Sequence, residues 1–102
     1  MIVIDYQGRQ IRLTQERLKH ILQHPEMVAM EEEIKTTLQY PEEVRRSKTD
    51  ASVVLSYRYY ENTQVGNKWL CVVTKYLNDD AFVITAYLTH RIKPGKLIWQ
   101  QL

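Results

Sequence analysis

The chain has 102 residues, of which 44% are hydrophobic and 25% charged, and its formal net charge is +2. These values are typical of one ordinary globular domain over residues 1–102, and they exclude a disordered chain. Uncharged runs are too short to span a membrane and a single cysteine excludes an intramolecular disulfide, so we expect a cytoplasmic protein that binds no membrane.

The positive charge lies mainly in the second half of the chain. Residues 1–50 carry eight Lys and Arg against nine Asp and Glu, whereas residues 51–102 carry six against three. A local basic cluster, "RRSK", spans Arg45–Lys48. An anionic partner would therefore favour the second half or this cluster, although the overall charge is too mild to indicate nucleic-acid binding by itself.

The first half predicts a hairpin followed by helices. Residues 2–13, "IVIDYQGRQIRL", read as a β-hairpin with Gly8 in its turn. Thr14 is a good N-cap for a helix that stops near Pro25. A stripe of hydrophobic residues at helical spacing predicts a second helix over residues 27–40, and "PEEVRRSK" at 41–48 predicts a further helical turn, because a proline and two acids open it.

After residue 50 the hydrophobic period changes from helical to two, which predicts strands. Four candidates follow one another with short, turn-rich connections: "SVVLSYRYYE" (52–61), "KWLCVVTKY" (68–76), "AFVITAYLTH" (81–90) and "KLIWQQ" (96–101). Short connections favour antiparallel neighbours. We therefore predict an α+β fold, in which an N-terminal hairpin and two or three helices pack on one face of a four-stranded antiparallel sheet.

Strand parity predicts which side chains lie on the open face of that sheet. In the strand at 81–90, Phe82, Ile84, Ala86 and Leu88 form the apolar set, which leaves two threonines and a tyrosine opposite. Tyr57 and Tyr59 are assigned inward. The same rule applied to the other strands gives an open face with two cations, several hydroxyls and no carboxylate: Arg58, Lys75, Thr85, Tyr87 and Thr89. Such a face is either an ordinary solvated surface or a site for a phosphate group.

Histidines offer acid–base chemistry but no evident metal site. His20 and His24 are four residues apart on a predicted helix, yet the pair lacks a neighbouring glutamate and a third ligand, so we expect no metal and no cofactor. His20 is the better candidate for a general acid or base, because imidazole titrates near neutral pH. His24 reads as a helix-terminal residue, and His90 follows the threonine strand and can reach the same site.

Several short segments together resemble a known family. They are "KHI", "HPE", "PEEVRRS", "LCVVTK" and "ITAYLT", and their order covers the chain from about Thr14 to Trp99. The chain resembles the small phage- and toxin-associated domains grouped with the barnase–EndoU–colicin–RelE (BECR) nucleases. That resemblance implies a metal-independent ribonuclease, a hydrolase of the RelE-like kind, with its site on the open sheet face. The low net charge departs from many ribonuclease toxins.

The resemblance and the face assignment together give the expected site. Cleavage would proceed by attack of a 2′-hydroxyl on the adjacent phosphate. The catalytic group is expected to comprise His20, Lys75, Thr85 and Tyr87. RNA phosphates are expected to contact Arg45, Arg46, Arg58 and Thr89.

Two other functions stay open on the sequence. One is an inactive module that binds RNA or a protein through the same face, and the other is an interaction domain with no nucleic-acid role. A toxin would also need an antitoxin or immunity protein, whose acidic residues would meet the open face. The oligomeric state is not fixed by the sequence.

Overall fold

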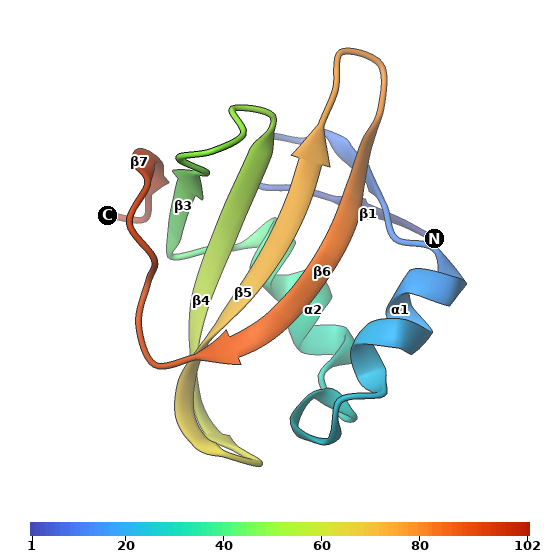
Figure 1. Ribbon diagram of the computed structural model, residues 1–102, viewed down its shortest axis with the longest axis vertical. Coiled ribbons are helices and arrows are strands. Elements are labelled where there is room, and N and C mark those ends of the chain that lie inside the picture. Colours follow the sequence, from blue (N-terminus) through green and yellow to red (C-terminus); the bar gives the residue numbers. More distant parts are fainter.

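Seven strands form one sheet, and two α-helices pack on one of its faces (Figure 1). The computed structural model describes residues 1–102. Across the sheet the strand order is β1-β2-β6-β5-β4-β3-β7, and every pair is antiparallel except β2 with β6. In chain order the elements are β1 (Ile2–Ile4), β2 (Gln10–Arg12), α1 (Gln15–Leu22), the 3₁₀ helix η1 (Pro25–Met27), α2 (Glu31–Gln39), β3 (Glu43–Arg46), β4 (Val53–Thr63), β5 (Gly66–Tyr76), β6 (Ala81–Thr89) and β7 (Lys96–Gln100).

The predicted fold class is wrong, because the sheet is mixed and has seven strands, not four antiparallel ones. The N-terminal hairpin is part of the sheet, joined to it through the parallel pair of Arg12 with Phe82. β7 lies at the far edge and pairs with β3, so it is not a neighbour of β6. Hydrophobic periodicity reports local structure, and it carries no signal for pairing between segments so distant in the chain.

Residues 43–46 form a strand where the sequence predicted a helical turn, so that prediction is wrong. Pro41 and the two following glutamates imitate a helix start. Val44 is fully buried, however, and β3 pairs with β4 on one side and with β7 on the other. Between two partners the short strand satisfies its backbone groups without any helical bond.

Both helices cover what we call the inner face of the sheet, the face that carries Leu70. Figure 1 shows α2 behind the central strands, with α1 beside it. α1 begins where the sequence predicted, because the Thr14 Oγ1 accepts a 3.1 Å hydrogen bond from the Arg17 backbone N. Ile34 and Leu38 of α2 belong to the same buried cluster as Leu70. No helix in the structure has the length and apolar character needed to cross a membrane.

The two edges of the sheet approach each other beyond the ends of the helices. Tyr6, in the turn between β1 and β2, has its ring centroid 5.2 Å from the ring centroid of Trp99 on β7. Because β1 and β7 are opposite edge strands, the sheet must curve around its inner face. Gly8 permits this tight turn with a φ of 87°. The turn therefore covers a part of the inner face that the helices leave open.

A buried carboxylate fixes that turn against β5. Asp5 is only 4% exposed. Its Oδ1 accepts hydrogen bonds from the backbone N atoms of Gln7 and Arg9 at 2.9 and 2.8 Å, and its Oδ2 accepts one from the Tyr76 hydroxyl at 2.6 Å. A carboxylate with three donors satisfies its charge locally, so the turn and the Tyr76 ring are held in one arrangement.

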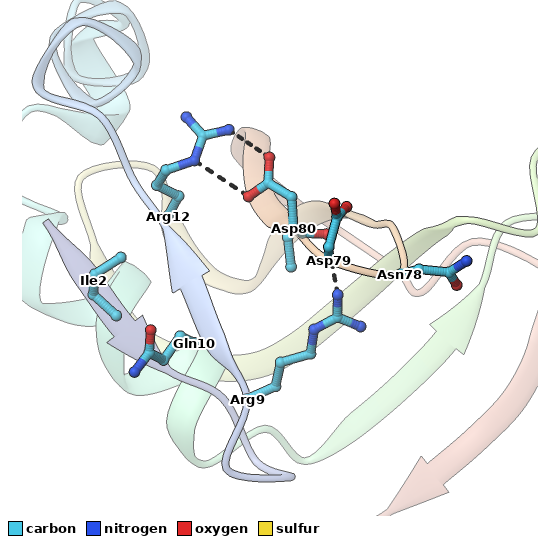
Figure 2. Close-up of a pocket in the computed structure, with 8 residues that line it drawn as sticks. Ile2, Arg9, Gln10, Arg12, Asn78, Asp79 and Asp80 are labelled. Atoms are coloured by element: carbon cyan, nitrogen blue, oxygen red, sulfur yellow. Dashed lines mark hydrogen bonds and ion pairs between the residues drawn. The ribbon is translucent and has the colours of Figure 1, made fainter.

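A second network joins the hairpin to the turn between β5 and β6 (Figure 2). Arg12 forms an ion pair with Asp80 at 2.8 Å, and the Arg9 guanidinium donates hydrogen bonds to the backbone oxygens of Leu77 and Asp80. These residues surround a hollow of about 280 Å³. Both arginines already have acceptors within the chain, so no unpaired positive charge faces the hollow. The network anchors the hairpin to the turn between β5 and β6.

Candidate functional site on the outer sheet face

The hydroxyl row of β6 lies on the outer face of the sheet, opposite the helices. Thr85, Tyr87 and Thr89 pair across the ladder with Val73, Cys71 and Trp69 of β5, whose parity is opposite to that of the buried Leu70. The predicted placement of the three residues on the open face is therefore confirmed. Their proposed role in binding a phosphate stays a prediction.

The inward and outward assignment of β4 is wrong. Arg58 is opposite Leu70 and so lies on the inner face, where its guanidinium donates a 2.7 Å hydrogen bond to the Tyr40 backbone O. Tyr57 and Tyr59, predicted to point inward, lie on the outer face. The strand-parity rule gave the wrong result because side chains on both faces of β4 are buried. Ser56 is buried on the inner face and Tyr57 on the outer face, so the strand shows no polar and apolar alternation.

A bulge in β6 changes the parity of its first residues. The register shifts between Val73 and Thr74 of β5, which leaves Ile84 as the extra residue of β6. Phe82, predicted to be in the core, is therefore opposite Lys75 on the outer face, and Arg12 lies over its ring at 5.3 Å. A single added residue reverses the side chains on one side of it, and strand periodicity cannot reveal this.

Residues 90–95, which we call the strap, connect β6 to β7 and cover part of the outer face. The Lys93 backbone N donates a 3.2 Å hydrogen bond to the Tyr57 hydroxyl, and the Lys93 Nζ lies 4.9 Å from the centre of the Tyr87 ring. Arg45 donates a 3.0 Å hydrogen bond to the Gly95 backbone O. No backbone-to-backbone hydrogen bond involves residues 90–95, so side chains hold the strap in place.

Beneath the strap lies a group of two phenols and a thiol. Tyr57 and Cys71 are fully buried, and the Tyr87 hydroxyl is buried without a hydrogen-bond partner. Burial raises the pKa of Cys71 to about 11, and it also raises the pKa of each tyrosine above its usual range. At neutral pH these groups are uncharged, so the thiol is a poor nucleophile and Tyr87 is a proton donor, not a base.

Lys75 is not a free cation. Its Nζ forms a 2.8 Å ion pair with Asp50, in the loop before β4. The hydrogen bond from Lys75, with others from Ser52, holds the pKa of the Asp50 carboxyl well below its usual range. A phosphate at Lys75 would have to compete with this carboxylate, which the sequence prediction of an acid-free face did not include.

The remaining predicted residues are distributed over different parts of the molecule. His20 is exposed on α1, on the helix side of the sheet, beside a hollow of about 250 Å³ that Arg17 also lines. Arg45 lies on the outer face, paired with Glu43 at 2.6 Å. Arg46 points to the inner face. The structure thus places Lys75, Thr85, Tyr87 and Thr89 on one face and separates them from His20, Arg46 and Arg58. Lys75 and Thr89 are nevertheless roughly 20 Å apart, because Thr89 pairs with Trp69, six residues before Lys75 on β5.

One feature of the outer face was missed on the sequence. Tyr59 and Trp69 are directly opposite each other on β4 and β5, with ring centroids 5.2 Å apart, and Tyr59 is 41% exposed. Thr89 pairs with Trp69 and donates a 3.2 Å hydrogen bond to the Arg91 backbone O, so the start of the strap lies beside the two rings. The sequence contains a signal for this pair, because Tyr59 and Trp69 are on the two sides of a short predicted hairpin and would be expected to face each other across it.

No group of three or more His, Cys, Asp or Glu side chains in the structure could hold a metal ion. Comparison of the chain with known protein families, with curated proteins and with solved structures gives no match in any of the three. The function must therefore be argued from the geometry of the site itself.

Proposed function

We propose that the protein binds single-stranded RNA on its outer face, with bases stacked on Tyr59 and Trp69. The observation that carries this proposal is an aromatic pair, of which Tyr59 is exposed and Trp69 half-buried, beside a strap that holds cations without acidic partners, Arg91 and Lys93. Sequence-tolerant RNA recognition combines stacking on aromatic side chains with cations along the backbone path.

The arrangement of the groups favours a bound strand over a catalytic centre. The Tyr59 ring is exposed, whereas Tyr87 lies beneath Lys93 and Lys75 is neutralised by Asp50. His20, the predicted general acid or base, is on the other side of the sheet. Binding requires only an accessible stacking surface and nearby positive charge, and the outer face offers both near the ends of β4 and β6.

A fluorescence anisotropy titration with a labelled single-stranded RNA tests the proposal. Tyr59→Leu and Trp69→Leu should each weaken binding about 5- to 150-fold, because stacking of one base contributes roughly 1–3 kcal/mol. Tyr40→Leu is the matched control, since Tyr40 is 66% exposed at the end of α2, and it should bind as the wild type does. Equal affinity of the Tyr59 and Tyr40 variants would reject the stacking surface.

The contribution of the strap is measured by the dependence of affinity on salt. Arg91→Gln should weaken binding and lower the slope of log affinity against log salt by about one unit, because one phosphate contact is lost. Arg17→Gln removes the same charge from the helix side and should leave the slope unchanged. An identical slope for both variants would place the RNA elsewhere on the molecule.

RNA cleavage is a second candidate, favoured by the position of Thr85 and Lys75 on the same outer face as the aromatic pair. The RNA from the binding assay, incubated in EDTA at enzyme excess and separated on a gel, should then show products that end in 2′,3′-cyclic phosphate. His20→Ala should keep this activity if the outer face acts alone and lose it if the predicted histidine takes part. Intact RNA would leave binding as the function. The protein would then need no antitoxin or immunity protein.

A further inference from the structure

A pocket of about 340 Å³ lies on the inner face, away from the proposed RNA surface. It is formed where four parts of the chain meet beyond the helices: the turn after β1, the β3–β4 region, the end of β5, and β7. Its lining residues are Tyr6, Gln7, Arg46, Ala51, Val54, Tyr76 and Ile98. Most of the wall is aromatic or aliphatic, and Arg46 is the single charged residue in it.

Arg46 makes no side-chain hydrogen bond or ion pair, whereas Arg45, the other partly buried arginine of β3, has partners for its terminal nitrogens although its Nε is also without one. No ion pair or hydrogen bond in the structure involves the Arg46 guanidinium, and the Arg46 Nε is buried without a partner. Its sequence neighbour Arg45 bonds to Glu43 and to Gly95, and Arg12 bonds to Asp80. A buried cationic donor without an acceptor is costly, so an anion in the pocket would stabilise it.

Two more buried polar groups without partners lie near Val54 on the inner face, although neither of them lines the pocket. Val54 is opposite Arg46 on one side and opposite Thr74 on the other. The hydroxyls of Thr74 and of Ser56, two residues along from Val54, are fully buried and make no hydrogen bond. Three of the unsatisfied buried atoms of the chain thus gather on this part of the inner face.

The walls of the pocket are held rigidly before any ligand enters. The Tyr76 hydroxyl is fixed by Asp5, and the Tyr6 ring rests on Trp99. The register of β7 shifts where Trp99 is opposite Val44, which leaves Ile98 as an extra residue that lines the pocket. A bulge of this kind re-aims a side chain, and a wall fixed in advance lowers the entropy lost on binding.

The charges around the pocket favour a negative ligand. Two carboxylates, Asp5 and Asp50, precede lining residues, but neither lines the pocket: Asp5 already accepts three hydrogen bonds, and Asp50 is paired with Lys75. On β7, Lys96 is opposite Arg46 in the ladder and adds a second positive charge to this edge of the sheet. Tyr6 and Arg46 line the same pocket; burial and Asp5 raise the pKa of Tyr6, and the positive charge of Arg46 opposes that shift.

We propose that this pocket binds a small aromatic anion, whose carboxylate or phosphate pairs with Arg46 and whose ring contacts Tyr6 and Tyr76. The volume is near the lower end of the range for small-molecule sites, which suits one mononucleotide or aromatic acid. Guanidinium groups bind both carboxylate and phosphate in a bidentate manner, so the shared chemistry defines the ligand class.

Thermal shift and saturation-transfer NMR with two pairs of probes test the proposal. The pairs are 5′-AMP with adenosine, and 4-hydroxyphenylacetate with its neutral amide. At least one anion should bind, and at least tenfold more tightly than its neutral counterpart. The arm that binds identifies phosphate or carboxylate as the natural group. Binding of neither anion at millimolar concentration, or equal binding of a neutral counterpart, would overturn the proposal.

Variants locate the binding. Arg46→Gln should weaken the anion at least tenfold, and Arg46→Lys should lose less. Arg17→Gln, the matched control, should bind as the wild type does. Ala51 is exposed at the mouth of the pocket, so Ala51→Leu should block entry without changing charge, which keeps the test decisive if Arg46→Gln does not fold. Undiminished binding by Ala51→Leu together with either Arg46 variant would overturn the site.

Discussion

The hydrogen bond between Tyr76 and Asp5 should stabilise the fold strongly, because both groups are largely withdrawn from water. Tyr76→Phe removes the donor at 2.6 Å and leaves one carboxylate oxygen without a partner, which should cost roughly 1.5–3 kcal/mol. Asp5→Ala also removes the acceptor for the Gln7 and Arg9 backbone N atoms, so its cost should be larger, about 3–5 kcal/mol. The double variant should cost less than the sum by about 1.5–3 kcal/mol, which is the energy of the shared bond.

Urea unfolding followed by tryptophan fluorescence measures all four corners of this cycle, and the denaturant slope should be the same in each. Tyr6→Phe is the control, because the Tyr6 hydroxyl forms no hydrogen bond in the structure and its removal should change stability by under about 0.5 kcal/mol. Additive costs in the double variant, or a Tyr76→Phe change as small as that of Tyr6→Phe, would show that the turn is not held by this bond.

Three further predictions concern the strap, the turns and the acid limb of stability. Cys71 should react with a disulfide reagent far more slowly in the folded than in the unfolded chain, because its thiol is buried and its pKa is raised to about 11. Lys93→Ala should speed this reaction about two- to fivefold, because it removes the contact with the Tyr87 ring and loosens the strap. Gly95→Ala places a Cβ 2.5 Å from a backbone oxygen of β3 and should destabilise the fold by about 1–3 kcal/mol. Gly8→Ala should cost less, because its Cβ meets open space and only the φ of 87° is unfavourable. The reverse order in unfolding experiments would contradict the packing of β7. Because the pKa of Asp50 is lowered in the folded chain, its ion pair stabilises the fold at pH values above the unfolded pKa of about 4, and this stabilisation is lost as the pH falls further. The wild type should therefore lose stability below about pH 4 more steeply than Asp50→Asn.

Local chemistry explains which parts of the fold could be predicted from the sequence. Thr14 starts α1 because its side chain caps the first turn, and that bond depends on neighbours in sequence. The hydroxyl row on β6 was placed on the correct face because the residues after Thr85 follow a regular ladder. Within a few residues, hydrogen bonding and side-chain period determine the structure, and the sequence displays both.

The errors came from contacts between distant segments. Arg58 was assigned to the wrong face because the strap buries Tyr57, and a strand covered on both faces has no contrast in hydrophobicity to read. The segment that forms β3 was predicted as a helical turn because its local residues imitate a helix start, while the strands that pair with it are distant in sequence and leave no local pattern. The partner of Lys75, Asp50, is 25 residues away, so no local pattern could show that this cation is neutralised.

The two proposals use opposite faces of one sheet, and this makes them separable by a single competition experiment. Tyr59 and Trp69 point outward from the central strands, whereas Arg46 points to the inner pocket between the turn and β7. A small anion that fills the pocket therefore touches none of the residues of the proposed RNA surface, which are Tyr59, Trp69, Arg91 and Lys93. Saturation with the anion should change the RNA affinity by less than about twofold at constant ionic strength, and Tyr59→Leu should bind the anion as the wild type does. Displacement of RNA by the anion would instead mean that RNA occupies the Arg46 pocket, and the outer face would then lose its part in binding.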